Sequence, residues 1–126
     1  MNILVIEDEP ASLKLANLVL SSDGHQVIQS HSAEHAMQTV LDTSPEIILL
    51  DLALPGMDGY TLTRRLKADP KTRNIPIIAV TSYPDRFPRE EALRAGCEAY
   101  IVKPIDTRKL SHQVTTIAAQ KSKPPK

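Results

Sequence analysis

The chain has 126 residues, of which 41% are hydrophobic and 24% are charged, a composition typical of one globular domain. Fifteen Lys and Arg balance fifteen Asp and Glu, so no basic excess favours nucleic acid, and we expect no direct nucleic-acid partner. A single cysteine, Cys97, excludes an internal disulfide and a cysteine-rich metal site.

Five short aliphatic runs recur along the chain and predict five strands. Four of them are continuous rather than alternating, which is typical of parallel strands covered on both faces. The second run is short and flanked by glutamines, so we predict an edge strand there. The runs are Ile3–Ile6, Val27–Ile28, Ile47–Leu50, Ile77–Val80 and Tyr100–Val102.

Helical patterns fill the gaps between these runs. Apolar residues recur at helical spacing in each gap, and polar or glycine residues mark several ends. Ser32 is the expected N-cap of the second helix, and Asp58 that of the third. The predicted helices cover about 11–22, 33–41, 60–68 and 88–94, and a fifth begins at Asp106 with Leu110, Val114 and Ile117 on one face.

Five strand–helix units predict an α/β fold, a three-layer (βα)5 sandwich in which helices cover both faces of a five-stranded parallel sheet. Right-handed crossovers restrict the topology. The flavodoxin-like strand order 2-1-3-4-5 is the common solution at this size, and ligands bind there beyond the C-terminal ends of the strands.

Polar side chains follow the strands at that ligand-binding edge. Glu7 and Asp8 come after the first strand, and Asp51 ends the third. Thr81 ends the fourth strand, and Lys103 follows the fifth. Because the first and third strands are neighbours in the predicted order, we expect the three carboxylates to converge.

Converging carboxylates repel one another, and a hard divalent cation with oxygen ligands offsets that repulsion. Mg²⁺ typically takes one or two carboxylates together with waters and phosphate. With Lys103 as a second positive charge, Asp51 is equipped to attack phosphorus, and Thr81 offers its hydroxyl to a phosphoryl oxygen. The expected product is an aspartyl phosphate on Asp51.

These residues and their surroundings resemble the receiver domain of bacterial response regulators, the CheY-like family. The resemblance covers roughly residues 2–117, and single-domain members are the most similar in layout. It is carried by LVIEDEP, DLALPGMDGY, the strand ending at Thr81, ALRAGCEAYIVKPID and the helix after it, in order and at matching intervals.

The resemblance implies a phosphoacceptor in a two-component phosphorelay. Asp51 would accept a phosphoryl group from a histidine kinase or a histidine phosphotransferase in a Mg²⁺-dependent reaction. Asp8, Asp51 and the backbone carbonyl of Ala53 would ligate the Mg²⁺ directly, with Mn²⁺ as an alternative metal. Glu7 would help to hold the ion through water.

The resemblance also implies a conformational switch. Lys103 would pair with Asp51 and later with the phosphate, and the Lys103–Pro104 peptide bond would be cis. Thr81 would move toward the phosphate and Tyr100 would turn inward, although an ordinary core aromatic is an alternative interpretation of Tyr100. These movements would remodel the face of the fourth helix, fifth strand and fifth helix, where a downstream protein binds.

The segment TSYPDRFPREEALRAG departs from the family pattern. The family usually has a small residue where Pro84 stands, and Pro88 follows four positions later. Because proline does not suit a helix interior, we expect an extended loop through about Phe87. Pro88 would then lie in the first turn of a shortened fourth helix.

Two positions beside the site tune the lifetime of the phosphoryl group in this family, and they correspond to Ala53 and Tyr83. Ala53 has no side chain that could orient a water molecule, and Tyr83 could screen the phosphorus. We therefore expect slow self-dephosphorylation.

Residues 1–120 are assigned to one receiver domain, and residues 121–126, KSKPPK, to a disordered tail or the start of a linker. The chain is a stand-alone receiver or one cut from a longer protein. It has neither a signal-peptide pattern nor an apolar run near the roughly 18 residues of a membrane span. We expect a cytoplasmic location, no membrane association, and a monomer or a phosphorylation-dependent homodimer.

Three other functions remain to be weighed against this non-enzymatic signalling role. A Mg²⁺-dependent phosphatase with an aspartate nucleophile would need a second aspartate where Ala53 stands. A flavodoxin-like cofactor binder would need a phosphate loop where the acidic EDEPAS follows the first strand. A degenerate receiver would serve as a phosphorylation-independent binding module.

Overall fold

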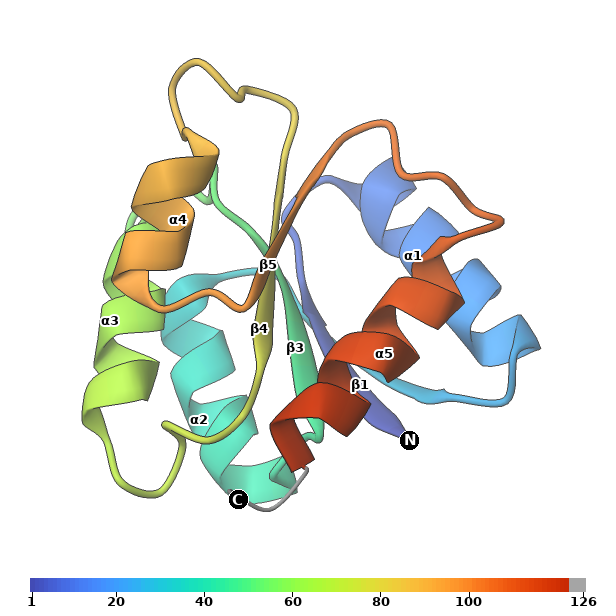
Figure 1. Cartoon of the computed structure of the whole chain (residues 1–126), viewed down its shortest axis with the longest axis horizontal. Helices are drawn as coiled ribbons and strands as arrows, with labels where there is room; N and C mark the ends of the chain where they lie inside the picture. Colours follow the sequence, from blue (N-terminus) through green and yellow to red (C-terminus); the bar gives the residue numbers. More distant parts are fainter. Residues whose placement is uncertain (123–126) are drawn as a thin grey trace.

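Strands and helices alternate along the whole fold (Figure 1). The structure is a computed structural model that describes residues 1–122. Its elements are β1 (Asn2–Ile6), α1 (Pro10–Ser22), β2 (Gln26–Ser30), α2 (Ala33–Thr43), β3 (Ile47–Asp51), α3 (Gly59–Ala68), β4 (Ile77–Thr81), α4 (Arg89–Ala95), β5 (Ala99–Val102) and α5 (Leu110–Ser122). The predicted α/β class is confirmed.

The strands form one parallel sheet in the order β2-β1-β3-β4-β5, as predicted. The chain moves outward from β1 to β2 and then returns to the other side of β1 with β3. Such a reversal of direction opens a crevice at the C-terminal strand ends. Glu7 and Asp51 lie on the two sides of that reversal, which accounts for where the acidic residues gather.

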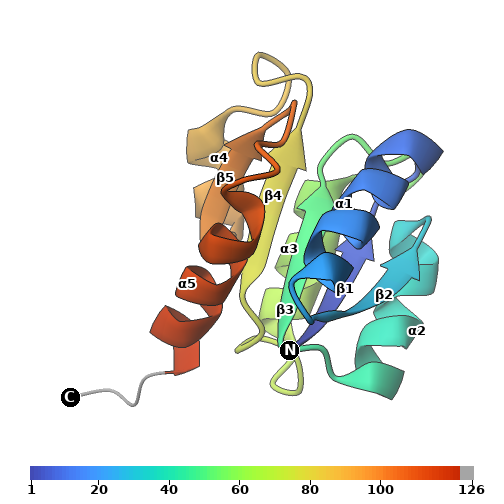
Figure 2. The same ribbon diagram turned by 90° about the vertical axis from the view of Figure 1, so that its right-hand side faces the viewer.

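Successive strand residues pack against opposite helical layers. Ile3 and Val5 join a buried cluster with residues of α1 and α5, whereas Leu4 and Ile6 join residues of α2, α3 and α4. Figures 1 and 2 show these two layers on either side of the sheet. Burial on both faces explains why the strands read as continuous aliphatic runs.

Local capping fixes the starts of two helices as the sequence predicts. The Ser32 side chain accepts a hydrogen bond from the backbone N–H of His35 at 3.1 Å. The Asp58 carboxylate accepts one from the N–H of Thr61 at 2.9 Å. Each cap satisfies a backbone donor that the first helical turn leaves unpaired.

The segment after β4 is a loop through Phe87, as expected, but it closes into a tight turn instead of running extended. The N–H groups of Arg86 and Phe87 both donate to the carbonyl oxygen of Tyr83, at 3.0 and 2.9 Å. Pro84 occupies the second position of this turn, where its fixed φ is favourable. Pro88 then precedes α4 as its N-cap.

The last helix begins at Leu110 rather than at the expected Asp106. The Asp106 carboxylate accepts the backbone N–H of Arg108 at 3.0 Å, which favours a separate turn before the helix. The predicted tail begins within α5, which extends to Ser122, and residues 123–126 lie outside the described residues. None of the helices in residues 1–122 has the length and apolarity needed to cross a membrane.

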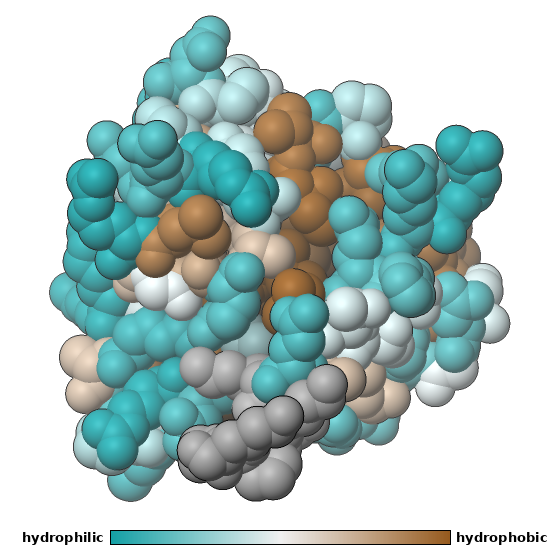
Figure 3. All heavy atoms as spheres, viewed as in Figure 1, coloured by the Kyte–Doolittle hydropathy of each residue, from teal (hydrophilic) through white to brown (hydrophobic). Residues whose placement is uncertain are grey.

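An apolar groove lies between β5 and α5. It has a volume of about 220 Å³ and includes Tyr100, Ile101 and Ile117 among its lining residues. Val102, at the end of β5, is exposed nearby. Figure 3 shows hydrophobic residues gathered near the centre of this face, over β5. Met1 and the last turn of α5 both lie at the opposite end of the sheet from the C-terminal strand ends (Figures 1 and 2).

Gly59, the first residue of α3, lies directly against the backbone that follows β3. A Cβ atom there would lie 2.7 Å from Leu52 Cα and 3.2 Å from the carbonyl oxygen of Asp51. We expect Gly59→Ala to lower the free energy of unfolding by about 1–3 kcal/mol, because this backbone must shift to make room. Urea denaturation measures the change.

The control is Thr61→Ala in the same helical turn, where the side chain is partly exposed. We expect a change of less than about 0.5 kcal/mol for this variant. Equal stabilities of Gly59→Ala and wild type would show that the approach of α3 to β3 is looser than described.

Candidate functional site

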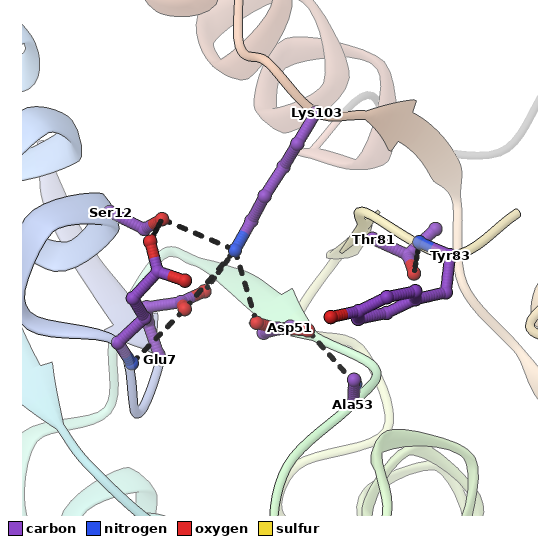
Figure 4. A network of polar contacts seen from close by, with 8 residues as sticks. Glu7, Ser12, Asp51, Ala53, Thr81, Tyr83 and Lys103 are labelled. Atoms are coloured by element: carbon purple, nitrogen blue, oxygen red, sulfur yellow. Dashed lines mark hydrogen bonds and ion pairs between the residues drawn. The ribbon is translucent and has the colours of Figure 1, made fainter.

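The C-terminal ends of β1, β3 and β5 bring Glu7, Asp51 and Lys103 together (Figure 4). Asp8 lines the same pocket. Glu7 and Asp51 are buried, and Asp8 is exposed. One oxygen from each carboxylate lies within 4.8 Å of the others. These side chains line a pocket of about 140 Å³, whose lining residues are Glu7, Asp8, Glu9, Asp51, Ala53, Ser82, Tyr83 and Lys103.

Asp51 is the last residue of β3, and both of its carboxylate oxygens have partners. Oδ1 accepts the backbone N–H of Ala53 at 2.8 Å. Oδ2 lies 3.2 Å from the Lys103 ammonium. With a fixed donor on one oxygen and a fixed charge on the other, the carboxylate is held in one orientation at the pocket.

Lys103 is the shared cation of the site. Its Nζ donates to both oxygens of Glu7, at 3.1 and 3.0 Å, and to Asp51 Oδ2 at 3.2 Å. It also lies 3.4 Å from the hydroxyl of Ser12 in α1. The Lys103–Pro104 peptide bond is cis.

The sequence predicts that Lys103 pairs with Asp51, and the structure adds two contacts of Lys103 that this prediction does not include. The first contact is with Glu7, which is expected to help hold a metal ion but here accepts hydrogen bonds from the ammonium with both oxygens. The second contact is with the hydroxyl of Ser12. The available signal for Ser12 was its place in the first turn of a helix that starts at the same edge of the sheet.

The electrostatics of this group follow from burial. Burial raises the pKa of Glu7 to about 8. A hydrogen bond to Asp51 and the negative charge of Asp51 add to this rise, whereas Lys103 opposes it. Burial alone would lower the pKa of Lys103, but Glu7 and Asp51 outweigh it, so that pKa is raised. Lys103 is therefore a permanent cation at physiological pH.

The donor set of the site suits a hard divalent cation. Three carboxylates offer oxygen ligands within one small pocket, and oxygen is the ligand type that Mg²⁺ prefers. The Lys103 ammonium faces three carboxyl groups, so a divalent cation would offset the negative charge that remains when all three ionise. Ala53, two residues after Asp51, lines the same pocket.

The remaining predicted residues lie on β4, β5 and the turn between β4 and α4. Thr81 is fully buried, and its hydroxyl accepts the N–H of Tyr83 at 2.9 Å. The Tyr83 side chain lines the pocket, and Figure 4 shows its ring pointing toward Asp51. Tyr100 donates its hydroxyl hydrogen to the carbonyl oxygen of Phe87 at 2.5 Å.

A family model, the response regulator receiver domain, matches residues 3–115. The response regulator PleD of Caulobacter vibrioides is 36% identical over 115 residues, which is 91% of this chain and 25% of PleD. The chain thus spans a quarter of the length of that relative. The polar-differentiation response regulator DivK of Brucella ovis is 35% identical over 82% of this chain and 85% of DivK.

A solved structure extends the comparison to the three-dimensional fold. The receiver domain of the sensor histidine kinase PA1611 of Pseudomonas aeruginosa superposes with a TM-score of 0.86 at 30% identity. The match covers 94% of this chain and 97% of the other. That structure has a magnesium ion coordinated in its active-site cleft.

The raised pKa of Glu7 predicts a pH-dependent stability. Between the ordinary value of 4.5 and the folded value of about 8, the folded state binds a proton more tightly than the unfolded state. The contribution of Glu7 to the free energy of unfolding is therefore fully present below pH 4.5 and is lost as the pH rises toward about 8. The loss is at most about 1.4 kcal/mol per pH unit.

Glu7→Gln mimics the protonated carboxyl and should lack this decline. Urea unfolding between about pH 5 and pH 8, with a chelator present, compares the two proteins. We expect the free energy of unfolding of the variant, minus that of wild type, to grow with pH. A difference that stays constant across this range would show that Glu7 is already ionised at its lower end.

Proposed function

This chain belongs to the family of response regulator receiver domains of two-component systems, and on that premise we propose that it is a phosphoacceptor switch. Asp51 takes a phosphoryl group from a phosphohistidine of a histidine kinase or histidine phosphotransferase. The N–P bond of the donor breaks as a P–O bond to an Asp51 oxygen forms, and the histidine ring leaves. The observation that carries this proposal is the buried Asp51 carboxylate, held by Ala53 N–H and Lys103.

Each neighbouring residue has a distinct part in the proposed transfer. Lys103 holds Asp51 beforehand and then neutralises a phosphoryl oxygen, and the Thr81 hydroxyl donates to another. Asp8, Asp51 and the Ala53 carbonyl would hold Mg²⁺, and Glu7 would help to hold the ion through water. Mn²⁺ also suits this set of oxygen ligands. When bound, the ion would supply positive charge to the phosphoryl oxygens.

The proposed output runs through the face made by α4, β5 and α5. Tyr100 is tied to the turn after β4 by its hydrogen bond to Phe87, and it also lines the apolar groove beside α5. A movement of Thr81 and the turn toward a phosphoryl group would therefore change the position of Tyr100. A downstream protein in the cytoplasm reads that change, with the domain a monomer or a phosphorylation-dependent dimer.

Phosphorylation of Asp51 predicts a definite change in mass. After incubation with acetyl phosphate and Mg²⁺, intact-mass spectrometry should find one added phosphoryl group on wild type. We expect none on Asp51→Asn, which lacks the attacking oxygen pair, and none on wild type with a chelator. Asp58→Asn, which retains a side-chain oxygen for capping α3, is the matched control and should be phosphorylated.

A wild-type protein that stays unmodified and also fails to bind fluoroberyllate, which reveals an acceptor site whose phosphoryl group is short-lived, would contradict the phosphoacceptor proposal. It would favour a binding module that works without phosphorylation. Modification of Asp51→Asn would place the acceptor elsewhere in the chain.

The residues beside the pocket predict a long-lived phosphoryl group. Ala53 offers no side chain to orient an attacking water, and Tyr83 lines the pocket with its ring pointing toward Asp51. We expect the double variant Ala53→Asn, Tyr83→Glu to lose the phosphoryl group at least about tenfold faster than wild type, because the new side chains can orient the attacking water and accept its proton, an effect that reaches about 10²–10⁴-fold where the base is fully positioned. The decay is followed by intact mass after the donor is removed, and a loss no slower in wild type would refute this assignment.

A further inference from the structure

The turn between β4 and α4 folds an arginine back onto the aromatic side chain at its own start. Tyr83 opens the turn and Pro84 follows it. The N–H groups of Arg86 and Phe87 both return to the Tyr83 carbonyl. Three residues after Tyr83, the Arg86 guanidinium carbon lies 5.7 Å from the centre of the Tyr83 ring.

The same guanidinium rests on a second ring that is well fixed. Its carbon lies 5.5 Å from the centre of the Phe87 ring. That ring packs against Tyr60 of α3, with centres 5.6 Å apart, and the Phe87 carbonyl holds the Tyr100 hydroxyl. Arg86 thus connects an anchored aromatic cluster to Tyr83.

Tyr83 needs such a contact to keep a defined position. The residue is 52% exposed, so burial does not fix the ring. Its backbone is held by the Thr81 hydroxyl, which leaves the side-chain torsions free. A cation within about 6 Å of a ring centre attracts the face of the ring, and Arg86 meets that condition on Tyr83.

We infer that Arg86 is a positioning residue that holds the Tyr83 ring across the phosphorylation pocket and thereby slows hydrolysis of phosphorylated Asp51. The inference rests on the proposed function. In that hydrolysis a water oxygen attacks phosphorus, the bond from phosphorus to the Asp51 oxygen breaks, and inorganic phosphate leaves with the proton of the water. The ring obstructs the approach of this water, and Arg86 raises the fraction of molecules in which the ring is in place.

The size of the effect follows from the strength of one exposed cation–π contact, which corresponds to a two- to fivefold change in an equilibrium. Hydrolysis runs through molecules in which the ring is displaced, and that fraction can rise by no more than this factor. We therefore expect Arg86→Ala to shorten the lifetime of the phosphoryl group by up to about two- to fivefold. Arg86→Lys should restore most of the lifetime, since an ammonium is also attracted to the ring face.

The test measures phosphoryl loss by intact mass in four proteins: wild type, Arg86→Ala, Tyr83→Ala and the double variant. If Arg86 acts through Tyr83, its removal changes nothing further once the ring is gone, and the cycle is strongly non-additive. Arg94→Ala, which removes an exposed arginine in the last turn of α4, is the matched control and should decay as wild type does. Melting temperatures recorded alongside separate a change in lifetime from a change in stability.

The outcomes separate this inference from the function on which it rests. A wild-type protein that never takes up a phosphoryl group overturns both. A phosphorylated wild type whose lifetime is unchanged by Arg86→Ala overturns the positioning role alone. The same fold-change for Arg86→Ala with and without the Tyr83 ring also overturns it, because Arg86 would then act independently of that ring.

Discussion

The ammonium of Lys103 is the interaction on which the site depends. It lies between Glu7 and Asp51, two carboxylates that are almost completely buried at the ends of adjacent strands. Two negative charges this close together and shielded from water raise the free energy of the folded state unless a cation or a proton offsets them. The raised pKa of Glu7 and the central place of Lys103 are two responses to that same electrostatic cost.

The parallel sheet supplies the geometry for this charge arrangement. β1 and β3 are adjacent and end together, since Ile6 pairs with Leu50, so the residues after them meet. Lys103 comes from β5, two strands away from β3, and its long side chain spans the distance. The hydrophobic layers keep these strands in register, so the core positions the charges although it contributes none of them.

The sequence was most informative where a residue acts on its near neighbours or where strand order alone decides. The run Ile47–Leu50, the caps Ser32 and Asp58, and the convergence of acidic residues beside Asp51 all followed from such rules. The start of α5 did not, because the Asp106 side chain closes its own turn with Arg108. The Glu7–Lys103 pair joins residues 96 positions apart, and no local pattern encodes which carboxylate a lysine prefers. The sequence pattern predicts an extended segment at Pro84, whereas Pro84 occupies the second position of the turn that returns Arg86 to Tyr83.

The position of Met1 and of the last turn of α5 has a practical consequence. Both lie at the N-terminal edge of the sheet, away from the pocket formed by Glu7, Asp51 and Lys103 (Figures 1 and 2). A fluorescent protein, an affinity tag or another folded domain joined at either point would lie at the end of the sheet opposite the pocket. Such fusions should leave the strand-end pocket accessible, which makes the domain well suited to use as a tethered reporter component.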